Sequence, residues 1–285
     1  MIKIFKYFVQ SIFIYLFFFI GKVLGISVSR KLFSKIFLFV GPLFKSKNII
    51  DYNLNIYSSN LSNNEKNYIK SEMWKNYGMT FIEYIYLNTF RKNSSHIEIK
   101  GDENLNIAIS KKKPLIFVSG HFANFELMSM ELTKKNIDLV TIYRPLNNLF
   151  INPLMEKLRK KYICQNQIKK GYSGIRESYT FLKNNFNLAL MIDQRVSEGI
   201  LSNLFGKPAY TTTIPAQIVK KFNCEIVPVY IERKKKYYFS IEIFKPLKFS
   251  PSEKTEIITS ELNKILEKMI LKNPDQWIWT HDRWK

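Results

Sequence analysis

The alternation of apolar and polar stretches predicts a layered α/β domain. Short, continuous apolar runs such as Leu115–Val118 are typical of strands covered on both faces. Between them, apolar residues recur at helical spacing. The predicted strands cover 97–100, 115–118, 138–143, 188–192, 225–231 and 237–244; the predicted helices cover 65–90, 105–111, a segment after Asn124, 149–161, 174–184, 214–222 and 252–271. Because strands alternate with helices, we expect a central, mostly parallel sheet flanked by helices.

Three polar stretches interrupt this pattern. Residues 48–67 are rich in Asn and Ser and read as a connector. Residues 168–174 contain Lys and Gly and read as a turn, and residues 196–213 read as a loop.

The N-terminal segment is the most hydrophobic part of the chain. Residues 8–20 form a 13-residue apolar run, which as a helix reaches about 20 Å, short of a bilayer core of about 30 Å. Extension to Val28 reaches a spanning length, and a second apolar block follows at 32–44. No small-x-small cleavage site follows. We expect residues 1–45 to be a membrane anchor and residues 46–285 the main domain; spanning, lying in the interface and a buried helical hairpin remain alternatives.

Polar side chains follow three of the predicted strands. His121 comes just after the first of them, Arg144 after the second, and Asp193 and Gln194 after the third. The carboxyl ends of parallel strands meet at one edge of a sheet, where ligands bind. We therefore expect these side chains to converge.

The stretch from His121 to Glu126 suggests a general base. Asn124 is the expected N-cap of the following helix, which places Glu126 in its first turn. Within one helix the two side chains would diverge, so His121 would lie on the preceding loop and fold back, donating one ring N–H to Glu126. The other ring nitrogen would face a cleft. A helix-capping or core histidine is the alternative reading.

The chemistry of the remaining strand-end residues is more open. Arg144 would bind a phosphate or stabilise an oxyanion, and Asp193 would orient Arg144 or bind a sugar hydroxyl. A structural Arg144–Asp193 ion pair is the alternative. No Ser or Cys nucleophile accompanies His121, which favours direct attack by a bound acceptor over a covalent intermediate.

Composition narrows the possible partners. With 44 Lys and Arg against 23 Asp and Glu, the formal charge is +21, which favours nucleic acid, anionic lipid, phosphorylated substrates or an acidic carrier protein. Lys-rich solvated turns are a simpler explanation of part of this excess. Two distant cysteines, Cys164 and Cys224, argue against a disulfide framework and a cysteine zinc site, and no nucleotide-binding or zinc-helix motif is present.

Five ordered motifs resemble those of the lipid A late acyltransferases, the lauroyl and myristoyl transferases of the lysophospholipid acyltransferase superfamily. The resemblance covers about residues 5 to 285 and rests on His121-Phe-Ala-Asn-Phe-Glu126, Tyr143-Arg144-Pro145, Asp193-Gln194, Phe205-Gly206-Lys207-Pro208 and Trp279-Thr-His-Asp-Arg-Trp-Lys285. It implies His121 and Glu126 as the catalytic pair and Asn124, Arg144, Asp193 and Gln194 as substrate-binding residues. The commoner motif reads His-x-Gly-Asn-Trp-Glu, so Ala123 and Phe125 are departures.

The resemblance further implies transfer of a fatty acyl chain from acyl carrier protein to a hydroxyl of a lipid A precursor. The expected location is the inner membrane, with the catalytic domain at its cytoplasmic face, and no metal or cofactor is expected. A lysophospholipid or another glycolipid is the alternative acceptor. A non-catalytic, basic membrane- or nucleic-acid-binding protein is the remaining alternative; no recognisable nucleic-acid module is present, so nucleic acid is not an expected partner.

Overall fold

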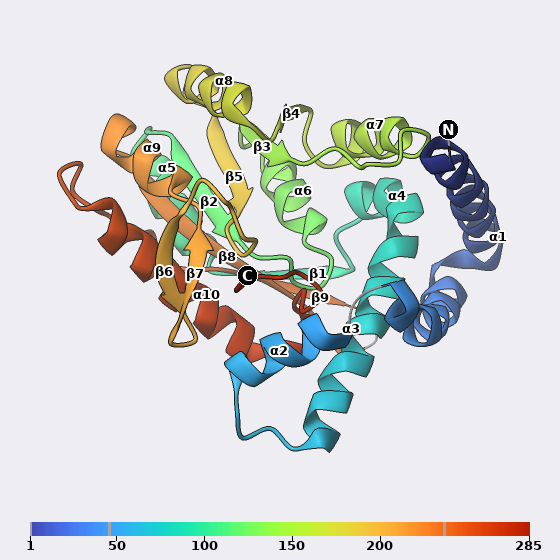
Figure 1. Cartoon of the computed structure of the whole chain (residues 1–285). Helices are drawn as coiled ribbons and strands as arrows, with labels where there is room; N and C mark the ends of the chain where they lie inside the picture. Colours follow the sequence, from blue (N-terminus) through green and yellow to red (C-terminus); the bar gives the residue numbers. More distant parts are fainter. Residues whose placement is uncertain (1, 45–46, 236–237) are drawn as a thin grey trace.

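A seven-stranded sheet forms the centre of the computed structural model, which describes residues 2–44, 47–235 and 238–285 (Figure 1). Among the described strands of this sheet, β8 and β9 alone pair antiparallel, and the other neighbours are parallel. The sheet order is β1 (Ile97–Lys100), β9 (Phe239–Ile243), β8 (Glu225–Arg233), β2 (Leu115–Ser119), β5 (Asn187–Met191), β3 (Leu139–Tyr143) and β4 (Asn166–Lys169). The predicted α/β class, with a mostly parallel sheet, is confirmed.

Helices cover both faces of this sheet. Along β2, Phe117 belongs to one apolar cluster and its neighbours Ile116 and Val118 to another, so the strand is buried on both sides. The described helices of the domain are α2 (Lys47–Tyr57), α3 (Asn63–Glu83), the 3₁₀ turn η1 (Tyr84–Tyr86), α4 (Leu87–Lys92), α5 (Asp102–Ser110), α6 (Glu126–Lys134), α7 (Asn152–Tyr162), α8 (Tyr172–Lys183), α9 (Ile214–Phe222) and α10 (Thr255–Lys272), with another 3₁₀ turn, η3 (Pro274–Gln276), near the C-terminus.

Two stretches that were expected to be a connector and a loop contain regular secondary structure, which corrects the sequence-based prediction. Within the expected connector, α2 buries Ile50 and Leu54, and this four-residue spacing is masked by the surrounding polar residues. The expected loop 196–213 contains a hairpin of β6 (Ile200–Leu204) and β7 (Lys207–Thr211). Its two turn residues both have positive φ, as type I′ hairpin turns require.

Two further predictions needed revision. The expected turn at 168–174 begins within β4, a short polar edge strand with little apolar pattern to reveal it. The single helix expected over 65–90 is divided by the 3₁₀ turn η1 into α3 and α4. The expected strand 237–244 is β9; residue 237 itself lies outside the described part of the chain.

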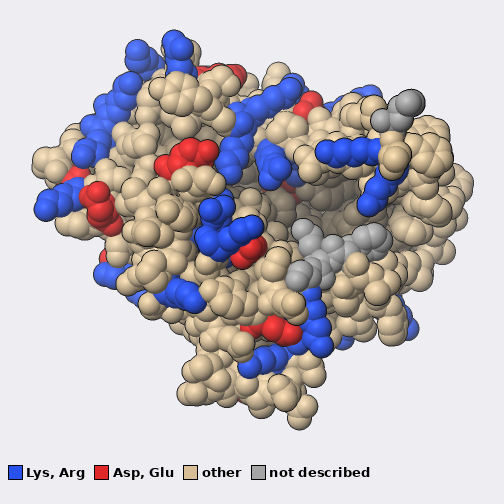
Figure 2. All heavy atoms as spheres, viewed as in Figure 1, with Lys and Arg blue, Asp and Glu red and all other residues tan. Residues whose placement is uncertain are grey.

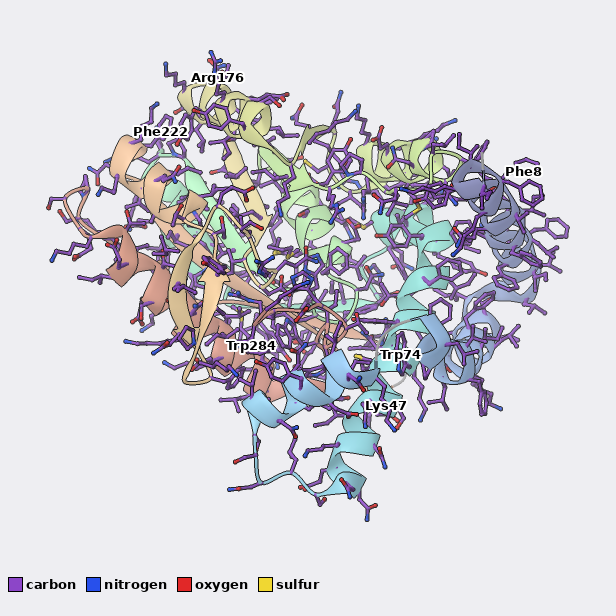
Figure 3. All side chains as sticks on the ribbon, in the orientation of Figure 1. Phe8, Lys47, Trp74, Arg176, Phe222 and Trp284 are labelled. Atoms are coloured by element: carbon purple, nitrogen blue, oxygen red, sulfur yellow. The ribbon has the colours of Figure 1, made fainter. Side chains whose placement is uncertain are left out.

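The N-terminal helix α1 (Ile2–Phe44) is long and apolar enough to cross a membrane by length and composition. Gly25 kinks it, with φ 73° and ψ 161°. The second half packs closely along α3, where a Cβ on Gly78 would lie 2.1 Å from the carbonyl oxygen of Phe33. Phe18 and Phe33 are buried, whereas most other apolar side chains of α1 are exposed. Figure 3 places Phe8 of α1 at the edge of the molecule opposite Phe222 of α9.

A buried carboxylate connects α1 to the rest of the fold. Glu83, at the end of α3, accepts hydrogen bonds from Arg30 Nε (2.6 Å), from the guanidinium of Arg233 at the end of β8 (2.5 Å), and from Asn124 Nδ2 (2.9 Å). Burial alone would raise the pKa of Glu83, but the two guanidinium groups lower it overall. The ionised carboxylate therefore holds together α1, α3, β8 and the loop after β2.

Candidate active site

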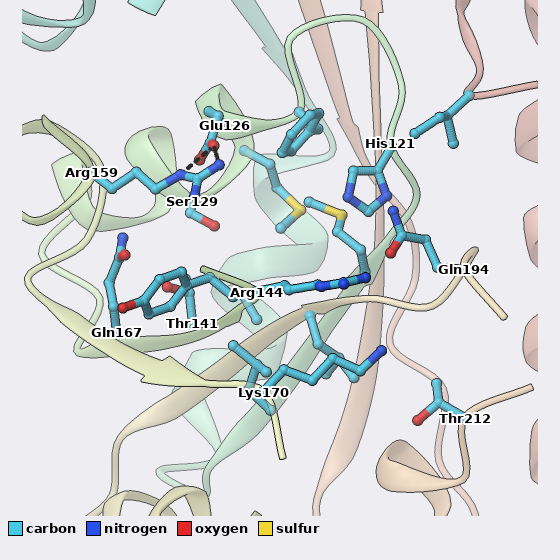
Figure 4. Close-up of a pocket in the computed structure, with 18 of the residues that line it drawn as sticks. His121, Glu126, Ser129, Thr141, Arg144, Arg159, Gln167, Lys170, Gln194 and Thr212 are labelled. Atoms are coloured by element: carbon cyan, nitrogen blue, oxygen red, sulfur yellow. Dashed lines mark hydrogen bonds and ion pairs between the residues drawn. The ribbon is translucent and has the colours of Figure 1, made fainter. Parts of the chain in front are cut away.

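The strand-end residues converge on one cavity, as the parallel sheet predicts. β2, β3 and β5 run in the same direction, and His121, Arg144 and Gln194 from their carboxyl ends all line a cavity of about 420 Å³ (Figure 4). The wall also includes apolar side chains such as Met128 and Ile142. A mouth with polar groups and a partly apolar wall suits an amphipathic substrate.

His121 is paired with Asp193, not with Glu126. Its Nδ1 lies 2.8 Å from Asp193 Oδ1, and its backbone N–H donates to Asp193 Oδ2 at 2.7 Å. Trp277 Nε1 donates to the same Oδ2 at 2.9 Å. Gly120 allows this approach, because a Cβ there would lie 2.7 Å from the Phe122 ring and 3.2 Å from Asp193 Oδ2. The carboxylate, itself fully buried, therefore fixes the orientation of the imidazole.

The buried pair shifts both pKa values. Burial alone would lower the pKa of His121, but the charge and hydrogen bond of Asp193 raise it overall, with a smaller contribution from Glu126. Burial would likewise raise the pKa of Asp193, but His121 and the Trp277 N–H lower it overall. Asp193 is thus an anion, and His121 takes up a proton more readily than an ordinary histidine.

Glu126 has other partners, so the expected hydrogen bond between His121 and Glu126 is wrong. Arg159 of α7 contacts the Glu126 carboxylate through Nε (2.7 Å) and a terminal nitrogen (2.6 Å), and the Tyr84 hydroxyl donates to it as well. Both Glu126 and Arg159 line the cavity. The catalytic role of Glu126 stays a prediction, whereas its direct support of the imidazole does not fit the geometry.

Asn124 occupies neither of its expected places. The helix α6 begins at Glu126 with Phe125 as N-cap and without a side-chain cap, so the N-cap expectation for Asn124 is wrong. Its buried amide donates to Glu83 and is not among the residues that line the cavity. Substrate binding by Asn124 stays a prediction.

Arg144 and Asp193 do not form the ion pair that was the alternative reading. Both carboxylate oxygens of Asp193 are occupied by His121 and Trp277, and its side chain is fully buried, which also removes it from contact with a sugar hydroxyl. Arg144 is exposed at the mouth of the cavity. Its guanidinium is therefore placed to meet an anionic group of a ligand.

Several residues of the site had no recognisable signal in the chain. Arg159 lies in a Lys- and Arg-rich helix, and in the sequence nothing distinguishes this partly buried arginine from its solvated basic neighbours. Lys170 follows β4, the strand that the apolar pattern did not reveal. Trp277 lies just before the C-terminal motif that begins at Trp279, so the density of tryptophan there was the only available indication.

A second histidine lines the cavity but is not free to act as a base. His281 Nε2 accepts the backbone N–H of Arg195 at 2.8 Å. Burial lowers the pKa of His281 to about 4, so it stays neutral at physiological pH. Among the described residues, no group of three or more His, Cys, Asp or Glu side chains is placed to hold a metal ion.

The family model for the bacterial lipid A biosynthesis acyltransferases matches residues 2–285. The chain belongs to this family. The match covers all but the first residue, including α1, and agrees with the resemblance carried by the five sequence motifs. A search of curated proteins finds no match. The protein is accordingly an acyltransferase of lipid A biosynthesis.

The departures of this acyltransferase from the common motif have a structural setting. Ala123 stands where the commoner sequence has Gly, and it adopts φ 44°, a left-handed conformation that favours glycine. Its backbone N–H donates to Gln276 O, and its carbonyl accepts from Thr80 Oγ1. Phe125, in place of Trp, lies with its ring centroid 4.6 Å from that of His121. The aromatic wall beside the imidazole is therefore retained.

Proposed function

We propose that this acyltransferase moves a fatty acyl chain from acyl carrier protein to a hydroxyl of a lipid A precursor, with His121 as the general base. The observation that carries the proposal is the His121–Asp193 pair at the cavity wall. With Nδ1–H held by a buried anion, the neutral imidazole has its lone pair on Nε2. Among the described residues, no hydrogen-bond partner occupies that nitrogen.

The reaction follows from this tautomer. The acceptor hydroxyl gives its proton to His121 Nε2 while its oxygen attacks the carbonyl carbon of the thioester, and Asp193 stabilises the imidazolium that forms. When the tetrahedral intermediate collapses, the C–S bond breaks and the imidazolium returns the proton to the departing thiolate. An ester and a free thiol result, and His121 is neutral again.

We assign Glu126 a supporting part in this scheme. It holds Arg159 at the cavity wall, and its charge adds to the raised pKa of His121. Arg159 and Arg144 are two of the cationic groups of the wall, and they would meet a phosphate or the developing oxyanion. The net charge of +21 favours both a phosphorylated lipid and an acidic carrier protein.

We further propose that the protein acts at the inner membrane, with its catalytic domain at the cytoplasmic face. The apolar helix α1 supports membrane attachment. The buried, reduced cysteines Cys164 and Cys224 fit a reducing compartment.

The test is transfer from acyl carrier protein, charged with a radiolabelled acyl chain, to a tetra-acylated lipid A precursor. A labelled penta-acylated product is expected from the purified protein and none from His121→Ala. The matched control is His96→Phe, since His96 lies before β1 and is not among the residues lining the cavity. Full activity of His121→Ala would exclude it as the base. Product with a lysophospholipid but not with the precursor would keep the mechanism and overturn the acceptor.

A further inference from the structure

The first half of α1, residues 2–24, is fastened to the loop that leads from β3 to α7. We call residues 144–151 the β3–α7 loop. Asn148 Nδ2 donates to the carbonyl oxygen of Tyr7 (2.8 Å), and the Tyr15 hydroxyl donates to the carbonyl oxygen of Phe150 (3.0 Å). The rings of Phe8 and Phe150 meet edge to face with centroids 5.5 Å apart. These contacts keep α1 alongside the domain (Figure 1).

This attachment continues beyond the loop. Phe18 packs on Phe81 of α3, and the carbonyl oxygen of Gly21 accepts from the Tyr86 hydroxyl. A helix held to polar loop backbone near its start and to the domain near its middle cannot stand alone across a bilayer, because the attached protein would have to enter the hydrocarbon with it. The structure therefore favours a helix lying on the membrane.

Apolar side chains are exposed on both α1 and the β3–α7 loop. Phe5 is 69% exposed and Phe13 54%, while Leu146 and Leu149 of the loop are 41% and 51% exposed. A patch of large apolar side chains on two adjoining segments is unusual on a soluble surface and marks an interaction site. It begins beside Arg144, which lines the cavity.

The charges around this patch fit an anionic lipid surface. Residues 2–44 contain no Asp or Glu. Exposed lysines flank the patch, at Lys3 and Lys6 on α1 and at Lys157, Lys160 and Lys161 on α7. Figure 2 shows Lys and Arg side chains around a hollow in the surface, where they outnumber acidic ones. Basic residues next to apolar ones are the arrangement of interfacial membrane-binding segments.

We propose that α1 lies in the plane of an anionic phospholipid membrane and that the β3–α7 loop inserts beside it, so that both form one lipid-contacting surface. This surface sets the mouth of the cavity at the level of the headgroups. A lipid acceptor then passes Arg144 into the cavity while its acyl chains stay in the bilayer. The inference rests on the membrane attachment in the proposed function and adds the orientation and the second inserting element.

The test measures how deep labelled residues lie in the bilayer, and not acyl transfer. Single cysteines replace Leu149, three exposed positions of α1 (Phe5, Phe13 and Val23) and the control position Ile257, and each carries an environment-sensitive fluorophore. The native cysteines are buried. The side chain of Ile257 is 50% exposed, nearly the same fraction as that of Leu149 (51%). Ile257 lies near the start of α10, on the other side of the molecule from α1 (Figure 1). The full-length protein is bound to phosphatidylethanolamine–phosphatidylglycerol vesicles that contain lipids brominated at known depths.

We expect quenching at residue 149 and at all three α1 positions, at similar shallow depths, and none at 257. Deep quenching at residue 13 with shallow quenching at 5 and 23 would show a spanning helix and overturn the in-plane orientation. Quenching on α1 but not at 149 would overturn the insertion of the loop. Quenching at none of these positions would overturn both parts, whatever acyl transfer the same samples catalyse, so this failure is separate from failure of the proposed reaction.

A charge substitution gives a second, independent measurement. Leu149→Asp is expected to weaken partitioning to the same vesicles about tenfold, and Ile257→Asp to leave it unchanged, since burial of one large apolar side chain and repulsion from anionic lipid are both lost only at residue 149. Unchanged partitioning of Leu149→Asp, with its fold confirmed by circular dichroism, would contradict the proposal.

Discussion

Replacing Asp193 by Asn tests the orientation of the imidazole with almost no change in shape. Asp193 Oδ1 faces the Nδ1 of His121, while Oδ2 accepts two N–H groups, from the His121 backbone and from Trp277. An amide has only one acceptor oxygen. Because two donors face the Oδ2 position, the Asn oxygen is expected there, which turns the NH₂ group towards Nδ1.

The consequence is the wrong tautomer of His121. With an NH₂ donor facing it, Nδ1 becomes the acceptor and the ring proton moves to Nε2, which can then no longer accept a proton from the acceptor hydroxyl. The loss of the buried anion also removes about 3–5 kcal/mol of imidazolium stabilisation. At about 1.4 kcal/mol per tenfold, kcat/KM is expected to fall by about 10²–10⁴.

The pH–rate profile provides the diagnostic measurement. In the unmodified protein, kcat/KM rises with pH as His121 loses its proton. The midpoint of this acid limb lies at a higher pH than the ordinary pKa of histidine, because Asp193 raises the pKa of His121. In Asp193→Asn, burial is opposed only by the smaller effect of Glu126, so the pKa of His121 falls and the limb of the residual activity moves to lower pH. The assay is transfer of the labelled acyl chain across a series of buffers.

A matched control is Asp102→Asn, whose side chain is 48% exposed and pairs with Lys135 at the surface. It is expected to retain activity, since surface ion pairs contribute little. An Asp193→Asn variant with normal folding, full activity and an unmoved limb would refute the assigned role of Asp193.

Three further predictions concern other buried groups. Glu126→Gln is expected to lower kcat about 10- to 100-fold, because Arg159 loses a charged partner, with only a small shift of the acid limb; an unchanged rate would reduce Glu126 to a structural role. Glu83→Gln removes the buried negative charge that Arg30 and Arg233 contact, and it is expected to lower the free energy of unfolding by about 3–5 kcal/mol, measured by denaturant titration; a loss below 1 kcal/mol would contradict the ion-pair network. The pKa of His96 is lowered to about 4, chiefly by burial, so the unfolded chain binds its proton more readily and stability falls as pH drops from about 6.5 to 4. His96→Phe is expected to flatten the thermal stability curve in that window, and an unaltered curve would exclude this contribution.

The fold was predictable where hydrophobic burial dominates. The interior strands are apolar on both faces, so their positions and the convergence of His121, Arg144 and Gln194 followed from the chain alone. The elements that were missed, α2, β4 and the β6–β7 hairpin, are short, and polar residues interrupt their apolar positions. These elements form because of tertiary contacts, which a local sequence pattern does not report.

The partner of His121 was not predictable for a different reason. Glu126 is close in the chain, whereas Asp193 comes near only because β5 lies beside β2 with Ser119 opposite Met191. That register carries the residues two positions further on, His121 and Asp193, to the same level. Strand order and register are not written in a local sequence pattern, so the nearer carboxylate was the natural but incorrect choice.

The Glu83 network has a practical consequence for work on this acyltransferase. Arg30 belongs to α1, so a shortened protein that begins after the apolar segment would lose one of the two guanidinium groups that keep this buried carboxylate ionised. It would also uncover the surface of α3 on which Phe33 packs. Soluble variants are therefore better sought by replacing exposed apolar residues of α1, such as Phe39 and Leu43, with polar ones than by removing the helix.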